Sequence, residues 1–192
     1  MTNTLYNAAA AGVLNLENVV HGLETALSQM PKNGDLINQI STIQDTFRKA
    51  AIVAAASDYE HKLTALIEGF FREGDYSDEC VTFVVTHAIK RKFFSYFDFD
   101  KNNTNKLFGS FGSTAKDRAN VLRKDVNSTF KRQETAFLLL CNTRNELVHS
   151  NFIQMPMEIT LEDVIKQYKD GLGFLSHFEQ IVTRSTTRDD PT

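Results

Sequence analysis

The spacing of apolar residues along the chain predicts helices. Residues 4–30 carry Leu and Val at helical intervals, and this run ends at Pro31. A second run begins at Asp35, a residue type that caps helices, and continues without a breaker to Gly74. It predicts either one helix of about 38 residues, about 57 Å long at 1.5 Å per residue, or two helices with a bend near Ser57.

The pattern changes twice in the middle of the chain. A third helix is expected to begin at Asp75 or Ser77 and to run into Phe94. After it, residues 95–112 crowd aromatic side chains among Asn and Lys and end in a Gly-Ser-Phe-Gly run. This composition predicts an irregular insertion that contains a short helix.

Helical spacing then resumes and predicts one long helix from about Ser113 to about His149. Pro156 interrupts the pattern. The last helix is expected to begin at Thr160, because Asp163 stands three residues later in a capping-box arrangement. Residues 183–192 form a polar tail.

Composition narrows the fold class to all-α. The 192 residues are 42% hydrophobic and 23% charged, with only three Pro and nine Gly, too few turn residues for a sandwich or barrel. We expect a single helical domain over residues 1–182. Cys80 and Cys141 show no disulfide or zinc spacing, and no apolar run is long enough to span a membrane. These features predict a cytoplasmic protein without a metal or another cofactor.

Charge is distributed unevenly along the chain. Residues 90–132 hold eleven Lys and Arg against four Asp, a local charge of +7, which leaves −10 for the rest of a chain whose total is −3. This asymmetry favours a polyanion such as RNA, with stacking by some of the aromatic residues of the insertion. The alternative is that the aromatic residues are core and the cations a solvated face. The candidate RNA contacts are Lys90, Arg91, Lys92, Lys116, Arg118, Arg123 and Lys124.

One arginine is placed where a helix should be apolar. At about 100° per residue, Arg144 lies on the same face as Phe137, Cys141 and Leu147. Because burying an unpaired guanidinium costs several kcal/mol, something anionic should meet it there. Asn145 and His149 fall on an adjoining polar edge. The alternative is an Arg that bridges to a carboxylate on a neighbouring helix and a surface His that benefits from the helix macrodipole.

These residue types suit phosphodiester chemistry. The Arg fork can bind a phosphate and stabilise the charge that grows on its oxygens in the transition state. The imidazole can take a proton from a ribose 2′-hydroxyl or return one to the leaving oxygen, so the reaction needs no metal.

The segment Arg144-Asn145-Glu146-Leu147-Val148-His149 resembles the Arg-Asn-x-x-x-His signature of HEPN domains. Residues 56–63 and 94–112 are similar to the RiboL-PSP-HEPN branch of ribonuclease-type proteins, which occur in prokaryotic defence and toxin systems. The likeness covers residues 50–181. It implies a helical bundle with one long signature helix that dimerises, so that two Arg and His pairs form one composite RNA-cleaving cleft.

Carried over residue by residue, the resemblance implies that Arg144 binds the scissile phosphate, His149 is the acid and base, and Asn145 orients one of them. Glu60 would be a polar residue beside the cleft. An antitoxin or a defence-system protein would be the partner. Ser150 and Asn151 stand where related toxins controlled by nucleotidyltransferase antitoxins have a Tyr after the His, which argues against control by tyrosine modification. The competing hypothesis is a non-catalytic adaptor that only binds RNA or protein.

Overall fold

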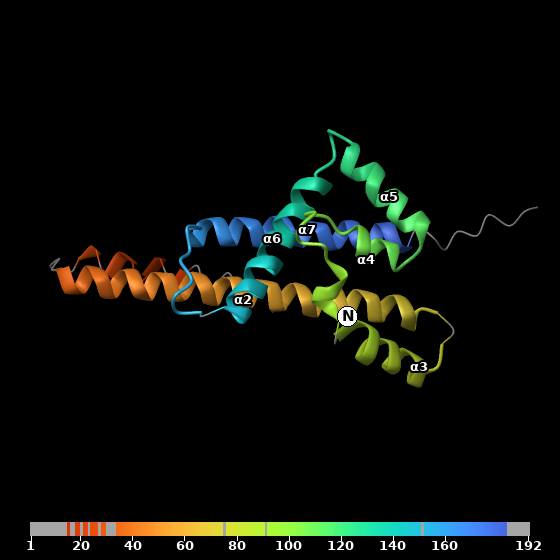
Figure 1. The fold of residues 1–192 in the computed structure, drawn as a ribbon, viewed down its shortest axis with the longest axis horizontal. Coiled ribbons are helices and arrows are strands. Elements are labelled where there is room, and N and C mark those ends of the chain that lie inside the picture. Colours follow the sequence, from red (N-terminus) through yellow and green to blue (C-terminus); the bar gives the residue numbers. More distant parts are fainter. Residues whose placement is uncertain are drawn as a thin grey trace, which may run out of the picture. The chain divides into compact units, whose positions relative to one another are not determined.

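The structure is a computed structural model, and it describes residues 15, 18–19, 21–22, 24–26, 28–29, 34–74, 76–90, 92–150 and 152–183. Helices dominate these residues (Figure 1). They contain no β-strand, and an isolated β-bridge joins Asp98 and Asn103. The all-α prediction is confirmed. Of the helix predicted over residues 4–30, the described positions 15, 18–19, 21–22, 24–26 and 28 are helical, position 29 is a turn, and the others lie outside the described residues.

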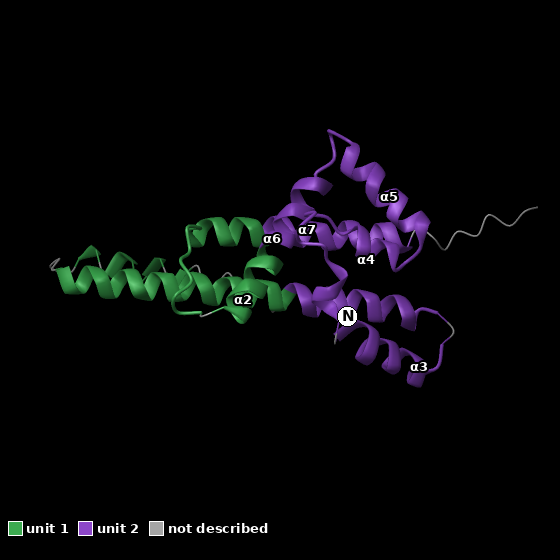
Figure 2. Ribbon diagram, in the orientation of Figure 1, with its two compact units in different colours: residues 1–58, 140–168 green, residues 59–139, 169–192 purple. Residues whose placement is uncertain are grey.

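The chain divides into two compact units (Figure 2). Unit 1 comprises the described parts of residues 1–58 and 140–168, and unit 2 comprises those of residues 59–139 and 169–192. Three helices, α2, α6 and α7, contribute residues to both units.

Helix α2 is continuous from Gly34 to Arg72 over 39 residues, so of the two alternatives the chain forms one helix. Its middle contains the run Ala50-Ala51-Ile52-Val53-Ala54-Ala55-Ala56, rich in the residue with the highest helix propensity and free of Gly and Pro. Because the side chain of alanine is small, other segments of the chain can pack close to this part of the helix. The buried apolar residues of unit 1 are Ala51, Ile52, Ala55, Ala56, Leu140, Cys141, Leu147, Val164, Ile165 and Tyr168.

Unit 1 also buries a hydrogen-bonded polar pair. The Tyr168 hydroxyl donates a hydrogen bond of 2.6 Å to an Asp58 carboxylate oxygen. Burial, followed by this hydrogen bond to Asp58, raises the pKa of the Tyr168 phenol. The hydroxyl therefore stays protonated and remains a donor.

The third predicted helix begins as expected but does not continue as one helix. The side chain of Ser77 caps α3 (Asp78–Phe83) by accepting a 3.3 Å hydrogen bond from the Cys80 amide. A π-helix, η1 (Val84–Lys90), and a 3₁₀ helix, η2 (Phe93–Tyr96), follow. The Tyr96 hydroxyl donates to the Ala88 carbonyl in η1.

The insertion supplies much of the core of unit 2. Phe93, Phe97 and Phe108 are buried. The ring centroid of Phe97 lies 5.4 Å from that of Phe137, and that of Phe108 lies 5.8 Å from that of Phe178. These three aromatic side chains are therefore core residues and do not stack on bases. The insertion contains the expected short helix, α4 (Asn105–Gly109).

The helix predicted from Ser113 to His149 is wrong, because the chain breaks into α5 (Ser113–Lys124) and α6 (Phe130–His149). In the break, Asp125 accepts a 2.9 Å hydrogen bond from the Asn127 amide, and Ser128 Oγ accepts one of 3.1 Å from the Phe130 amide. Such side-chain bonds to nearby backbone compete with the helix. Val126, which an unbroken helix would place on the same face as Arg144, is 95% exposed.

The last helix is confirmed. Helix α7 (Leu161–Thr183) is preceded by Thr160, whose hydroxyl oxygen accepts a 3.1 Å hydrogen bond from the Asp163 amide. The same hydroxyl donates to the Asp163 carboxylate at 2.7 Å. The predicted polar tail beyond Thr183 lies outside the described residues.

Candidate functional site

Arg144, Asn145 and His149 lie together in unit 1, on the last six residues of α6. Arg144 is half-buried, and its Nε atom is fully buried. Cys141 and Leu147, three residues before and after it, are buried on the same face of the helix. The guanidinium therefore projects from the inward face of α6, as the sequence pattern predicted.

The two other signature residues differ in exposure. Asn145 is half-buried, and His149, the last residue of the helix, is exposed. Beside them, the Asn142 amide donates to Glu146 at 2.9 Å, and the Ser150 amide donates to the Glu146 carbonyl at 2.8 Å. The His149 imidazole is therefore accessible from solvent.

The loop after His149 is fastened to α2 by a buried lysine. The Lys49 ammonium lies 2.6 Å from Asp45 Oδ2, donates to the Ile153 carbonyl at 3.2 Å, and sits 5.7 Å from the centre of the Phe152 ring. Because Lys49 is only 1% exposed, these three partners have to stabilise its charge in place of water. The sequence analysis missed Lys49. Its i,i+4 spacing from Asp45 was the available signal.

Glu60, the fourth predicted catalytic residue, is half-buried on α2 and belongs to unit 2. The signature residues belong to unit 1. Glu60 therefore keeps the status of a prediction from the resemblance alone.

The predicted RNA contacts fall into two groups in unit 2. Lys90, Lys92, Lys116 and Lys124 are exposed, whereas Arg118 and Arg123 are half-buried. One amino group of Arg118 donates to the Ile181 carbonyl at 3.2 Å. Arg91 lies outside the described residues. Of the predicted contacts that the structure describes, the four lysines are thus the most accessible to a phosphate.

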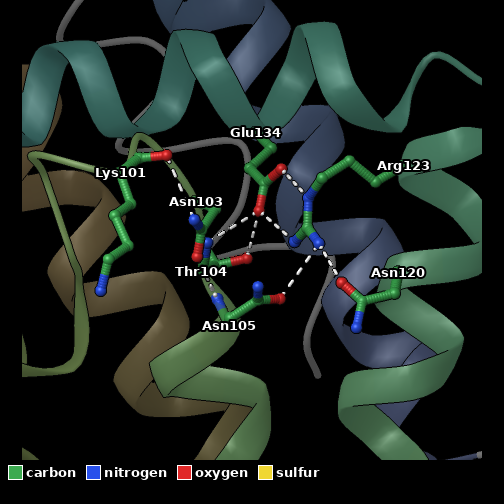
Figure 3. A network of polar contacts seen from close by, with 7 residues as sticks. All are labelled: Lys101, Asn103, Thr104, Asn105, Asn120, Arg123 and Glu134. Atoms are coloured by element: carbon green, nitrogen blue, oxygen red, sulfur yellow. Dashed lines mark hydrogen bonds and ion pairs between the residues drawn. The ribbon is translucent and has the colours of Figure 1, made fainter.

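Arg123 is engaged in a buried network centred on Glu134, which is 1% exposed (Figure 3). Two nitrogens of Arg123 donate to the two oxygens of Glu134, at 2.8 and 2.7 Å. Its third nitrogen donates to Asn105 at 3.0 Å and to Asn120 at 2.6 Å. The Thr104 amide and hydroxyl also donate to Glu134. The charge of Arg123 is therefore neutralised inside the protein.

Sequence reasoning overlooked Glu134, although a signal was present. Glu134 follows buried Phe130 by four residues and precedes buried Phe137 by three, so it lies on the apolar face of α6. A carboxylate in that position predicts a cationic partner. The partner, Arg123, comes from the preceding helix.

Among the described residues, no three His, Cys, Asp or Glu side chains are grouped as metal ligands. In the same part of the chain, no helix is long and apolar enough to cross a membrane. Cys80 is exposed, Cys141 is buried, and both are free thiols.

The helical fold and the Arg-Asn-x-x-x-His helix end define the class of HEPN domain proteins. The chain matches the model of one family in that class, RiboL-PSP-HEPN, over residues 23–184, and it belongs to this family. No curated protein and no solved structure gives a match.

Proposed function

We propose that the protein is a metal-independent endoribonuclease with Arg144, Asn145 and His149 as its catalytic residues. The observation that carries this proposal is the end of α6, where a half-buried Arg144 and an exposed His149 lie within six residues of each other. Membership of a HEPN family supports RNA as the substrate.

In the proposed reaction the RNA supplies its own nucleophile. The 2′-oxygen attacks the adjacent phosphorus, a bond from phosphorus to O2′ forms, and the bond from phosphorus to O5′ breaks. One imidazole takes the proton of the 2′-hydroxyl, and an imidazolium gives a proton to the departing 5′-oxygen. Arg144 holds the non-bridging oxygens and stabilises their charge. The products are a 2′,3′-cyclic phosphate and a 5′-hydroxyl.

One His149 cannot be base and acid at the same moment, and a homodimer would supply the second. Val148 and Ile153, on either side of His149 and Ser150, are 53% and 84% exposed and offer an apolar surface for a two-fold contact. Light scattering at tens of micromolar should give the mass of two chains. The double variant Val148→Asp/Ile153→Asp should give one chain and lose cleavage. A wild-type monomer that cleaves RNA would contradict the composite site.

Substrate binding is assigned to the exposed lysines of residues 90–132, whose charge suits the RNA backbone. Glu60 is assigned a supporting place beside the cleft. In a cell, such an enzyme would be a toxin or an antiphage effector, held in check by an antitoxin or another protein of a defence system. Expression of the wild type, and not of His149→Ala, should then arrest growth.

The decisive experiment is cleavage of a single-stranded RNA by the purified protein in EDTA. The wild type should cut it, and His149→Ala should not. His87→Ala is the matched control, because His87 is also an exposed helical histidine and lies in the other unit. DNA of the same sequence should survive for want of the 2′-hydroxyl.

Two results would contradict the proposal. Cleavage of DNA, or activity that returns to a chelated sample only with added magnesium, would refute the roles of Arg144 and His149. RNA that is bound and never cut would favour the non-catalytic adaptor.

A further inference from the structure

A groove of about 750 Å³ lies between α5 and α7 within unit 2. Its apolar lining comes from Val121, Leu122 and Ile181, and its polar lining includes Asp117, His177 and Gln180. Val121 is 67% exposed, so its side chain is accessible to a ligand in the groove. The groove therefore combines apolar walls with a few polar groups, the composition of a small-ligand site.

His177 can act in this groove as a neutral hydrogen-bonding group. Burial lowers the pKa of its imidazole, so the ring is uncharged at pH 7 and carries one donor and one acceptor. The ring packs edge-on against Phe130 with centroids 5.4 Å apart, and Nε2 lies 3.5 Å from the Thr129 hydroxyl. These contacts fix the ring at the side of the groove.

Helix α5, which forms one wall of the groove, carries a net positive charge. Helix α5 carries Lys116, Arg118, Arg123 and Lys124 against Asp117. Because Glu134 neutralises Arg123, the remaining cations outnumber Asp117 by three to one. Of these cations Arg118 lines the groove, and Lys116 and Lys124 are exposed elsewhere on the same helix. A ligand with phosphates for these lysines and a flat apolar part for the groove suits this surface, and a strand of RNA with one base turned out of its stack is such a ligand.

We propose that the groove between α5 and α7 binds an unstacked nucleobase of the RNA substrate and prefers bases with an exocyclic amino group. The Asp117 carboxylate can only accept hydrogen bonds, so it favours the amino groups of cytosine, adenine and guanine. Uracil has an N3–H donor, but this donor stands between two carbonyl oxygens that repel a carboxylate. The inference rests on the proposed function for the identity of the ligand as RNA, and it does not depend on cleavage.

The first test measures binding of a single-stranded RNA to variants in the cleavage-deficient His149→Ala background. Adding Val121→Asp should raise the Kd for RNA about tenfold, since it puts a negative charge on the apolar wall of the groove and beside the RNA backbone. Val126→Asp is the matched control. It adds the same charge five residues away, at a 95% exposed position between α5 and α6, and should change the Kd less than twofold.

The second test reports the base directly. An RNA that carries 2-aminopurine should become more fluorescent when His149→Ala binds it, because the base leaves its stack. The increase should persist with Val126→Asp and vanish with Val121→Asp. In the same background an oligocytidine should bind several-fold more tightly than an oligouridine, and Asp117→Asn should bring that ratio close to one. A loss of folding alone would not change a ratio between two RNAs.

Equal Kd values for the Val121→Asp and Val126→Asp variants would overturn the inference. So would a change of oligomeric state in Val121→Asp with unchanged RNA affinity, which would make the groove a contact between copies of the chain. The outcomes separate from those of the proposed function. Groove-dependent binding without any cleavage by the wild type would contradict the proposed nuclease activity and support the base site. Cleavage by the wild type with equal Kd values for the two variants would support the nuclease activity and contradict the base site.

Discussion

The two ends of α6 both carry charged side chains on the inward face of the helix, and the structure uses them differently. Near the start, Glu134 is buried and receives four hydrogen bonds from Arg123 and Thr104. Near the end, Arg144 is half-buried, and His149 beyond it is exposed. A charged residue on an apolar face is therefore no sign of function by itself. The exposure of its neighbours on the helix distinguishes the two positions.

The buried pair has an evident structural purpose. Thr104 and Asn105 belong to the insertion and the start of α4, Asn120 and Arg123 to α5, and Glu134 to α6. One carboxylate thus joins three segments that are separated along the chain. Because an isolated buried carboxylate is costly, each of these segments must be in place before Glu134 is stabilised.

The sharpest test of this comparison is to replace Arg144 and Arg123, each in its own variant, with Lys. Arg144→Lys should lower the rate of RNA cleavage by about 100-fold or more, because a point charge cannot replace the bidentate fork on a phosphate. Its thermal unfolding should stay close to that of the wild type. Arg123→Lys should do the opposite, with a lower Tm and, at a temperature where it is folded, near-normal cleavage. A similar loss of Tm in both variants would mean that Arg144 is a structural residue as well.

The second prediction concerns stability alone. Arg123→Ala should lower the free energy of unfolding by about 3–5 kcal/mol, because it leaves Glu134 buried without its cation. Arg132→Ala is the matched control, since Arg132 forms a 2.6 Å ion pair with Asp170 through a side chain that is 60% exposed. That loss should be no more than about 1 kcal/mol. Urea unfolding measures both values, and equal losses would show that burial does not set the strength of these pairs.

The third prediction contrasts the basic section with the rest of the surface. Lys90→Glu should flatten the dependence of RNA affinity on salt, because each phosphate contact on a single strand contributes a slope of about 0.7. Lys166→Glu makes the same change at an exposed position of α7 in unit 1 and should affect the slope less. If the two variants behave alike, the lysines of residues 90–132 are only a solvated face.

The smallest expected effect is a pH dependence of stability through His177. Its pKa in the folded protein is lowered by burial, so the unfolded chain binds the proton more readily. The protein should therefore lose stability as the pH falls below about 6.5, the ordinary pKa of histidine, and keep it above that value. His177→Gln should reduce this loss. A difference in unfolding free energy between the two proteins that does not change from pH 7.5 to 5.5 would contradict the assignment.

Local features of the sequence were sufficient for several elements. The alanine-rich middle of α2 and the capping residues Ser77 and Thr160 act through the backbone within a few positions, so their consequences could be predicted from spacing. The same holds for the inward position of Arg144, which depends only on the period of the helix. By contrast, the local hydrogen bonds of Asp125 and Ser128 were available in the sequence and were missed.

Tertiary structure decided what the periodicity could not, namely the partner of each inward-facing charge. Apolar spacing shows which face of a helix is buried, and this is a property of one segment. Whether Arg123 meets a phosphate or Glu134, and whether Lys49 is a surface lysine or the buried anchor of the loop after His149, depends on segments far apart in the chain coming together. The free energy of a buried charge is set by those contacts, and the spacing within one segment does not contain them.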